Sequence, residues 1–343
     1  MPSAVAVSAL VVAYGEEPEL GHCLRALLDS EGVAIEVVVV DNGDRSGAVG
    51  EFEDDQRVRI CRPGSNLGFA AGCNLAAAAA TGDVLALVNP DAVVAPDALV
   101  HLVNALDSPG VGIATASVRL AEAPDTMNSA GNPVHYLGLA WAGGHGEPAS
   151  AHADPATVAS ASGACCALRA EVWFQLGGFD PAYFAYHEDV EFSLRCWQRG
   201  LSVVYVPDAV VVHHYAFSRN DLKNFLLERN RLLTVLTTYS GRTLLGLAVP
   251  LLALEATVLA VAARAGWLPA KVRGYRWLVR HRTQIRRRRQ RLQGERLCSD
   301  HDLAGIYAVT FDPGPGTVPA GRLTALANRA SAAGGRVFVW WAR

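Results

Sequence analysis

The first 90 residues alternate between apolar runs and segments with leucine or alanine at helical spacing. Pro18–Ser30 carries four leucines at that spacing, and Leu75–Ala80 is rich in alanine. Each helical segment lies between two apolar runs, and this β-α-β alternation predicts a parallel sheet with right-handed crossovers. The expected strands are Val5–Tyr14, Ile35–Val40, Val58–Cys61 and Val84–Val88.

The strand Val84–Val88 is followed by Asn89-Pro90-Asp91. Proline fixes φ and removes a backbone donor, so the strand ends and Asp91 lies on a rigid corner. Ligands of open α/β sheets bind outside the carboxyl ends of the strands, where a carboxylate suits a hard cation such as Mg²⁺ beside a diphosphate. Asp41, after the second strand, should emerge at the same edge. Both stretches are also ordinary turn sequences, so the residues alone leave the two readings open.

Length and composition set limits on the class of protein. A chain of 343 residues predicts one large domain of roughly 200 to 250 residues with an appendage. The formal net charge of −3 says little about partners, and the seven cysteines lack CxxC spacing, so neither a disulfide framework nor a zinc site is indicated. We therefore expect a reducing cytoplasm. The N-terminal apolar run has no basic residues before it, which favours a strand over a signal peptide.

The segment Asn66–Asn74 is rich in glycine and asparagine and precedes the alanine-rich helix. Backbone donors at a helix N-terminus bind phosphate, although glycines there can equally serve close helix packing. The first turn, Tyr14-Gly15-Glu16-Glu17, has two acidic residues and no GxGxxG pattern. This argues against a dinucleotide-dependent oxidoreductase.

Together these segments resemble the nucleotide-sugar half of family 2 glycosyltransferases of the GT-A fold, in particular the rhamnosyltransferase-like branch. The resemblance covers about residues 5 to 240. It implies an α/β fold with a Rossmann-like mixed sheet flanked by helices, as a catalytic domain over 1–240. The later motifs, in family order, are Ser162-Gly163-Ala164, Leu168-Arg169, Gly177-Gly178-Phe179-Asp180, Phe184, His187-Glu188-Asp189-Val190-Glu191, Arg195, Gly200, Pro207-Asp208-Ala209, His213-His214 with Ser218, and Glu228-Arg229-Asn230-Arg231.

The resemblance implies roles for the acidic cluster at 188–191. Asp189 is expected to be the general base, with Glu188 and Glu191 shaping its pKa or binding sugar hydroxyls. Acidic residues also favour the start of a helix through the macrodipole alone, which is the alternative reading of the cluster. Arg195 follows Glu191 by four residues, so we expect the two to form an ion pair on one helix face.

The resemblance also implies a donor site. Asp91 and His213 are expected to hold a divalent metal, Mg²⁺ or Mn²⁺, at the diphosphate. Many relatives carry a second carboxylate in this metal motif, where the present chain has asparagine. The residues expected to bind the nucleotide sugar are Tyr14, Glu16, Asp41, Asn42, Asn66, Gly68, Phe69, Gly72, Asn74 and Asn89.

Beyond residue 240 the composition changes. Leu244–Ala263 is apolar apart from Glu255, and Arg264–Arg291 is densely basic with interspersed Trp267 and Trp277. We expect 241–298 to be helical and to lie in the interface of an anionic membrane. The alternatives are a membrane span, a nucleic-acid patch, or a helical hairpin packed on the catalytic domain with solvated arginines, which the glutamate favours. The tail 299–343 has no functional interpretation.

The sequence thus predicts an inverting glycosyltransferase that moves a hexose from a nucleoside diphosphate sugar to a saccharide or polyprenyl-linked acceptor, without nucleic acid. The donor is expected to be dTDP-L-rhamnose and the pathway cell-envelope polysaccharide or glycoconjugate synthesis, at the inner face of the cell membrane. The alternatives are transfer of galactose, glucose or GlcNAc, or an inactive sugar-binding relative. Loops such as Asn128–Pro155 are expected to decide specificity.

Overall fold

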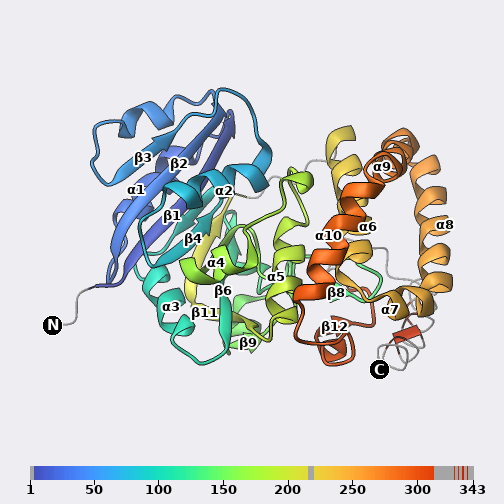
Figure 1. The fold of residues 1–343 in the computed structure, drawn as a ribbon. Helices are drawn as coiled ribbons and strands as arrows, with labels where there is room; N and C mark the ends of the chain where they lie inside the picture. The colour runs from blue at the N-terminus through green and yellow to red at the C-terminus, as the bar shows by residue number, and fades with distance from the viewer. Residues whose placement is uncertain are drawn as a thin grey trace.

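The computed structural model describes residues 4–214 and 220–312, with residues 328, 331, 334, 335 and 338. Ser218 of the family pattern and Pro313-Gly314-Pro315-Gly316 lie outside the described residues. Four parallel strands form the first half of a mixed sheet (Figure 1), in the order β3-β2-β1-β4. This confirms the predicted parallel arrangement, because the four strands are β1 (Ala6–Gly15), β2 (Ala34–Asp44), β3 (Val58–Cys61) and β4 (Val84–Val88).

The second half of the sheet continues in the order β10-β6-β11-β5, and β10 is antiparallel to both of its neighbours, β4 and β6. β11 runs parallel to β6 as one strand, and its register shifts between Val206 and Val210, where Pro207 interrupts the ladder. The sheet is therefore mixed, as expected for GT-A. Its remaining strands are β5 (Ala92–Val94), β6 (Val111–Leu120), β7 (Ala123–Ser129), β9 (Ala156–Thr157), β10 (Cys165–Arg169) and β11 (Ser202–His213).

Helices cover both faces of the sheet. The side chains of β1 alternate between two hydrophobic clusters, with Val11 in one and Val12 in the other. α1 and α3 complete the first cluster, whereas α2, α4 and α5 complete the second. Both faces of β1 are thus buried, which explains its nearly continuous apolar sequence. These helices are α1 (Leu20–Leu28), α2 (Gly68–Ala79), α3 (Ala98–Leu106), α4 (Ala170–Leu176) and α5 (Glu188–Gln198), with short 3₁₀ helices at η1 (Ala48–Phe52), η2 (Ala149–His152) and η3 (Pro181–Tyr183).

Five further helices gather on one side of the sheet (Figure 1). α6 packs against α9 and α10, and α8 packs against α9. The apolar stretch expected over 244–263 is divided between α7 and α8, and Pro250 lies in the first turn of α8, where its missing N–H is tolerated. Among the described residues, no helix has both the length and the apolarity that crossing a membrane requires. The five are α6 (Asp221–Thr238), α7 (Gly241–Gly246), α8 (Ala248–Arg264), α9 (Leu268–Arg280) and α10 (Arg282–Glu295).

The chain after α10 returns to the catalytic part. β12 (Tyr307–Ala308), just after η4 (Ala304–Ile306), pairs in parallel with β8 (Val134–His135). Tyr307 also packs edge-on against Tyr239, with ring centroids 5.6 Å apart. The first part of the 299–343 segment therefore stabilises the 134–139 region.

Candidate active site

The turn after β4 is held by the neighbouring strand β10. The Asn89 N–H donates to the Ala164 carbonyl at 2.9 Å, and the Ala92 N–H donates back to the Asn89 carbonyl at 3.1 Å. These bonds fix the backbone around Pro90. The Asp91 side chain keeps 23% of its surface exposed, so the carboxylate is rigidly placed yet accessible.

Asp91 contacts His213, the last residue of β11. His213 Nε2 lies 3.0 Å from Asp91 Oδ1, and His213 Nδ1 lies 2.9 Å from Asn128 Oδ1. An amide oxygen only accepts, so Nδ1 donates to Asn128 and Nε2 is directed at the Asp91 carboxylate. The structure thus brings the predicted metal pair together. His214 instead turns towards Glu19, at 3.5 Å.

This donor set fits a hard divalent cation. Adjacent ligands of an octahedral ion with bonds of about 2.1 Å lie about 3 Å apart, close to the 3.0 Å between His213 Nε2 and Asp91 Oδ1. Three or more His, Cys, Asp or Glu side chains do not converge as a metal site anywhere in the described part of the chain. Diphosphate and water oxygens would complete the coordination, as is usual for Mg²⁺. Burial raises the pKa of nearby Glu17, and the charge of Asp91 adds to the rise, so a cation here would also relieve acidic repulsion.

The turns after β1 and β2 lie at the same edge of the sheet. Tyr14 is 62% exposed, and Glu16 is an exposed residue paired loosely with Arg45 at 4.0 Å. Asp41 Oδ1 accepts the backbone N–H groups of Gly43 and Asp44, at 3.1 and 2.9 Å. Tyr14, Glu16 and Asp41 therefore line an open edge, and their contact with a nucleotide stays a prediction.

Asn42 and Asn66 hold a turn together. The buried Asn42 amide donates to Asn66 Oδ1 and to the Gly68 carbonyl, both at 3.1 Å, and its oxygen accepts from the Leu67 N–H at 2.9 Å. A Cβ on Gly68 would lie 2.6 Å from the Phe184 carbonyl oxygen, and the residue has φ +79°. Only glycine fits there, so the turn brings the start of α2 against the segment before α5.

Phe69, Gly72 and Asn74 lie inside α2, which begins at Gly68 and not after Asn74 as the sequence suggested. A Cβ on Gly72 would lie 2.8 Å from Val12, so this glycine serves close packing of α2 on β1, the alternative that the sequence left open. The Asn74 side chain bonds both the carbonyl and the N–H of Phe179, at 2.7 and 2.9 Å, and Phe69 packs near the Phe179 ring. These three residues position α2, and donor contact by them stays a prediction.

Asp189 lies in the first turn of α5 and faces the β10 edge. Its Oδ2 accepts the Gly163 N–H at 3.2 Å, and its Oδ1 accepts the Val190 N–H at 2.8 Å. Since Ala164 bonds the Asn89 backbone, the 162–164 segment lies between Asp189 and the turn that carries Asp91. Burial raises the pKa of Asp189 although these backbone bonds oppose the shift, and a raised pKa makes the carboxylate a stronger base.

Burial also shifts the pKa values of Glu188 and His187, the two residues before Asp189, towards the uncharged forms. Burial raises the pKa of Glu188 well above its usual range, and the neighbouring Asp189 charge adds to the rise. Burial also lowers the pKa of His187 to about 4, with a further contribution from Arg231. Both shifts favour the uncharged form of the side chain, so Asp189, whose two oxygens accept backbone N–H groups, is the carboxylate of the Glu188–Asp189 pair that is better suited to proton transfer.

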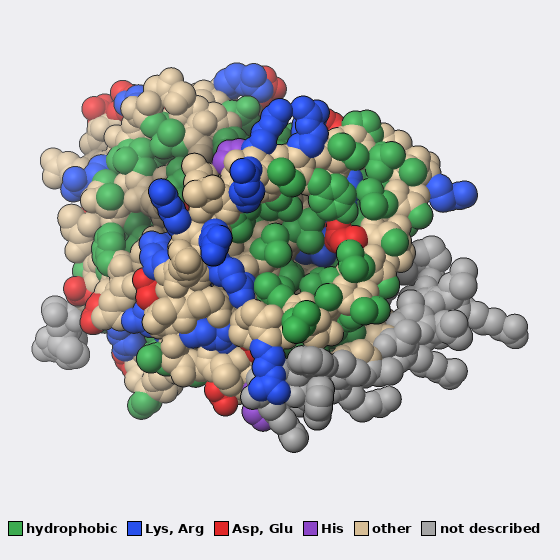
Figure 2. Space-filling view, turned by 45° about the vertical axis from the view of Figure 1, so that its right-hand side comes forward, with side chains coloured by type: hydrophobic (Ala, Val, Ile, Leu, Met, Phe, Trp, Pro, Cys, Tyr) green, Lys and Arg blue, Asp and Glu red, His purple; other side chains and the backbone are tan. Residues whose placement is uncertain are grey.

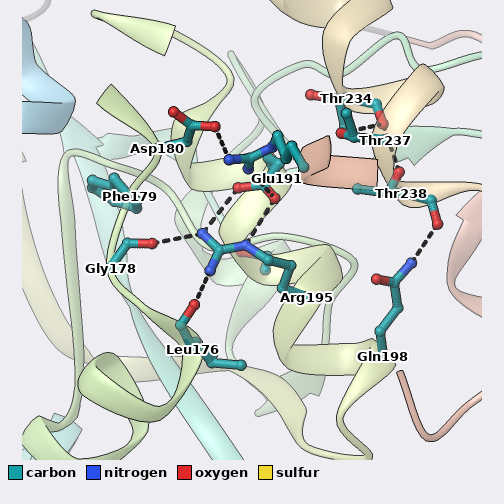
Figure 3. Close-up of polar contacts among 12 residues, drawn as sticks. Leu176, Gly178, Phe179, Asp180, Glu191, Arg195, Gln198, Thr234, Thr237 and Thr238 are labelled. Atoms are coloured by element: carbon teal, nitrogen blue, oxygen red, sulfur yellow. Dashed lines mark hydrogen bonds and ion pairs between the residues drawn. The ribbon is translucent and has the colours of Figure 1, made fainter. Parts of the chain in front are cut away.

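Glu191 is not available to a substrate, which corrects its predicted place in the catalytic cluster. Its side chain is fully buried, and Arg195 binds both of its oxygens, at 2.8 and 3.0 Å (Figure 3). Arg288 of α10 contacts it as well, at 2.7 Å. Arg195 also donates to the Leu176 and Gly178 carbonyls. The predicted Glu191–Arg195 pair is thus confirmed, and it joins α5 to the 176–178 turn.

The segment before α5 is strained. Among the described residues, every non-glycine residue with positive φ lies here, namely Phe184 (63°), Tyr186 (69°) and His187 (67°). Such backbone persists only when its surroundings hold it, and it concentrates at functional sites. It places the side chains of Glu188 and Asp189 at the start of the helix.

Two residues of α6 hold this strained segment. The buried Asn230 amide donates to the carbonyls of Tyr183, Ala185 and Tyr186, at 3.0, 2.9 and 2.6 Å. Arg229 Nη2 donates to the Tyr183 carbonyl at 2.8 Å. The sequence analysis included Arg229 and Asn230 in a motif of the resemblance but predicted no role for either. It named Asn128 only as the first residue of a loop and did not predict its bond to His213. The sequence feature that could have indicated a structural role for Arg229 and Asn230 is a polar pair inside an otherwise amphipathic helix.

The mixed sheet, the Asp91–His213 pair at its carboxyl edge and Asp189 of α5, bonded to the adjoining 162–164 segment, are the features expected of a glycosyltransferase of GT-A architecture. The family model described as "Glycosyltransferase like family 2" matches residues 2–232 of the chain. The chain therefore belongs to glycosyltransferase family 2, as its motifs predicted.

Two similar proteins are named for roles in glycan synthesis. The chain is 28% identical over 238 residues to the N-acetylglucosaminyl-diphospho-decaprenol L-rhamnosyltransferase of Mycobacterium tuberculosis, covering 61% of this chain and 76% of that enzyme. It is 30% identical over 227 residues to the O-antigen biosynthesis protein RfbC of Myxococcus xanthus, covering 61% of this chain and 17% of that protein. An uncharacterised protein of Sinorhizobium fredii is 30% identical over 201 residues, or 54% of this chain. The chain spans under a quarter of the latter two relatives, at 17% and 22%.

Solved structures share the fold. A mannosyltransferase from Pyrobaculum calidifontis in complex with GDP-Man and Mn²⁺ matches with a TM-score of 0.50 and 21% identity, over 85% of this chain and 86% of that one. GalNAc-T7 with UDP, GalNAc and Mn²⁺ matches with a TM-score of 0.57 and 16% identity, over 70% and 49% of the two chains. At these identities the likeness concerns the architecture alone.

Proposed function

We propose that this protein is an inverting hexosyltransferase that moves L-rhamnose from dTDP-L-rhamnose to a saccharide carried on a polyprenyl diphosphate, in cell-envelope polysaccharide synthesis. The observation that carries the proposal is the placement of Asp189. Its carboxylate is held by the Gly163 N–H on one side of the 162–164 segment, and the Asp91–His213 pair lies beyond the other side. An acceptor base and a diphosphate site are thus both fixed to the short 162–164 segment, and the proposal is that they act on one donor–acceptor pair.

The reaction requires one displacement at the anomeric carbon. Asp189 Oδ2 or Oδ1 takes the proton of an acceptor hydroxyl as that oxygen forms the new bond to C1, and the bond from C1 to the diphosphate oxygen breaks with its electron pair. Attack opposite the leaving group inverts the configuration. Asp189 ends protonated and the nucleoside diphosphate leaves as an anion.

Departure of the diphosphate requires positive charge near its oxygens. Asp91 and His213 would hold Mg²⁺ or Mn²⁺ there, and the ion would act as a Lewis acid on the developing phosphate charge. Asn128 orients the imidazole through the 2.9 Å bond to Nδ1, which keeps Nε2 directed at Asp91. Tyr14, Glu16 and Asp41, in the turns at the carboxyl ends of β1 and β2, would bind the nucleoside and sugar.

The choice of rhamnose and of a lipid-linked acceptor rests on similarity. The mycobacterial relative is named as an L-rhamnosyltransferase of N-acetylglucosaminyl-diphospho-decaprenol, and 76% of its length aligns with this chain. RfbC and a matching stretch of a succinoglycan biosynthesis protein from Rhizobium meliloti, 33% identical over 110 residues, support a polysaccharide pathway.

The test is a transfer assay with purified protein. Product formation is measured with dTDP-L-rhamnose, UDP-galactose, UDP-glucose and UDP-GlcNAc, each with a synthetic polyprenyl diphosphate GlcNAc acceptor and with Mg²⁺, Mn²⁺ or EDTA. The proposal predicts metal-dependent turnover that is fastest with the rhamnose donor. Turnover with another donor would replace the sugar assignment, and absence of both transfer and donor hydrolysis would indicate an inactive relative.

A further inference from the structure

α8 presents an apolar face to solvent. On a helix, Val249, Leu252, Ala256 and Ala260 are spaced as i, i+3, i+7 and i+11 and share one stripe. All four are exposed, and Val249 and Leu252 keep 77% and 69% of their surface accessible. Leu245 of α7, 70% exposed, lies one turn before this stripe. We call these five residues the α8 face. A contiguous exposed apolar patch of this kind marks a site of interaction.

The one acidic residue of α8 points away from this face. Glu255 pairs with Lys271 at 2.8 Å and with Arg231, and it accepts the Tyr275 hydroxyl at 2.5 Å. The side chains of Lys271 and Arg231 are 1% and 2% exposed, so the pairs lie on the protein side of the helix. α8 is therefore fastened to α6 and α9 by its glutamate. The α8 face carries no charge.

Arginines lie near both ends of the α8 face, at Arg242 and Arg264, and on the adjoining helix α9, at Arg276 and Arg280. Residues 241–295 hold eleven arginines and one lysine against two glutamates, whereas the whole chain has a net charge of −3. Figure 2 shows hydrophobic side chains gathered over the C-terminal helices, with basic side chains along the margins of that area. Eight of the arginines are exposed and have no ion pair with a described carboxylate, namely Arg242, Arg264, Arg276, Arg280, Arg282, Arg286, Arg287 and Arg291.

We infer that the α8 face docks into the interface of an anionic membrane, with the nearby arginines on the lipid phosphates. An uncharged stripe bordered by unpaired basic side chains is complementary to a surface with an apolar interior and negative head groups. The Glu255 pairs hold α8 alongside α9, so the helix lies along the surface. Trp277 is not part of this face: its ring is stacked on His281 at 4.1 Å and carries the Arg229 guanidinium at 4.5 Å.

The inference goes beyond the sugar chemistry and is tested without substrates. The full-length protein is floated with vesicles of phosphatidylglycerol and phosphatidylcholine, and with vesicles of phosphatidylcholine alone. We expect binding to the anionic vesicles that falls with added salt. Val249→Ser with Leu252→Ser should lower binding roughly tenfold or more, and Leu297→Ser, at a leucine that is also 77% exposed, should not change it.

The basic border is tested in the same assay. Arg276→Gln and Arg280→Gln should each lower binding to anionic vesicles by about fivefold, whereas Arg59→Gln, at an exposed position of β3, serves as the matched control. Binding that is unchanged by the α8 substitutions would overturn the inference, as would no binding to either vesicle. Dimerisation without lipid that the α8 substitutions abolish would assign the face to a second copy of the chain. If the protein floats with anionic vesicles but shows no transfer activity, membrane docking is supported and the proposed function is contradicted.

Discussion

Replacing Asp189 with asparagine tests the assignment of the base with little change in shape. The amide cannot take the acceptor proton, and a positioned base contributes roughly 10²- to 10⁴-fold, or about 2.7 to 5.4 kcal/mol of the barrier. We therefore expect kcat to fall by that factor. Donor affinity should be unchanged, because Asp189 bonds backbone groups and not the Asp91–His213 pair.

The structure also sets the cost in stability. One carboxylate oxygen accepts the Val190 N–H and the other accepts the Gly163 N–H, and asparagine keeps a single acceptor. Losing the longer bond, to Gly163, should cost about 1–3 kcal/mol of the free energy of unfolding. Relief of the buried charge offsets part of this, because burial raises the pKa of Asp189. The variant should therefore stay folded, since domains are stable by about 5–15 kcal/mol.

The assay is a pH profile of kcat with donor affinity measured separately by calorimetry. A base works only when deprotonated, so wild-type kcat should rise with pH as Asp189 loses its proton, and Asp189→Asn should lack that rise. Glu188→Gln is the matched control, because the amide is isosteric and the raised pKa of Glu188 disfavours the charged form that a base requires. Near-normal turnover by Asp189→Asn would refute the assignment, and an equal loss of donor binding would move Asp189 to the metal site.

Three further predictions concern the neighbouring residues. Asp91→Ala should abolish transfer and metal-dependent donor binding while leaving the melting temperature within a few degrees, and donor binding indifferent to EDTA would remove the metal from this site. Asn230→Ala should lower the free energy of unfolding, measured in urea, by about 2–4 kcal/mol, because three carbonyls of the strained backbone lose a donor. Asn224→Ala, at a partly exposed position of the same helix, is the control, and an equal effect of the two substitutions would contradict the proposed support of the strained segment by Asn230. Glu188→Gln should raise the melting temperature at pH 8 and not at pH 4, because the raised pKa of Glu188 makes the native state bind the extra proton, so that wild-type stability falls as pH rises. An equal gain at both pH values would exclude this linkage.

The sheet was largely predictable because its central strands are buried on both faces. Continuous apolar runs with proline or glycine at their ends predicted β3 and β4 with the observed bounds, and β1 and β2 to within a few residues. The insertion of antiparallel β10 between β4 and β6 was not predictable, because strand order depends on pairings between residues about 50 and 80 positions apart that no local pattern records.

Roles within the site were less predictable than its location. Asp91 and His213 came together as their strand ends implied, yet three carboxylates in one helical turn look alike in sequence. Glu191 differs from Asp189 because Arg288, nearly a hundred residues later, reaches its oxygens. Asn42 and Asn74 likewise bond backbone groups, since a short amide beside a glycine-rich turn serves the turn as readily as a ligand.

The boundary expected at residue 240 cuts through the support of the catalytic helix. Glu228 of α6 is paired with Lys271 at 2.6 Å, and Glu255 is paired with Arg231 of α6, so charges on either side of the boundary neutralise each other. Removing one partner of a buried pair leaves an uncompensated charge, which costs about 3–5 kcal/mol. Since α6 also clamps the strained segment before Asp189, the basic C-terminal helices support the active site from inside while their exposed arginines remain available to a surface. Point substitutions on the α8 face, and not truncation after α6, therefore separate docking from folding.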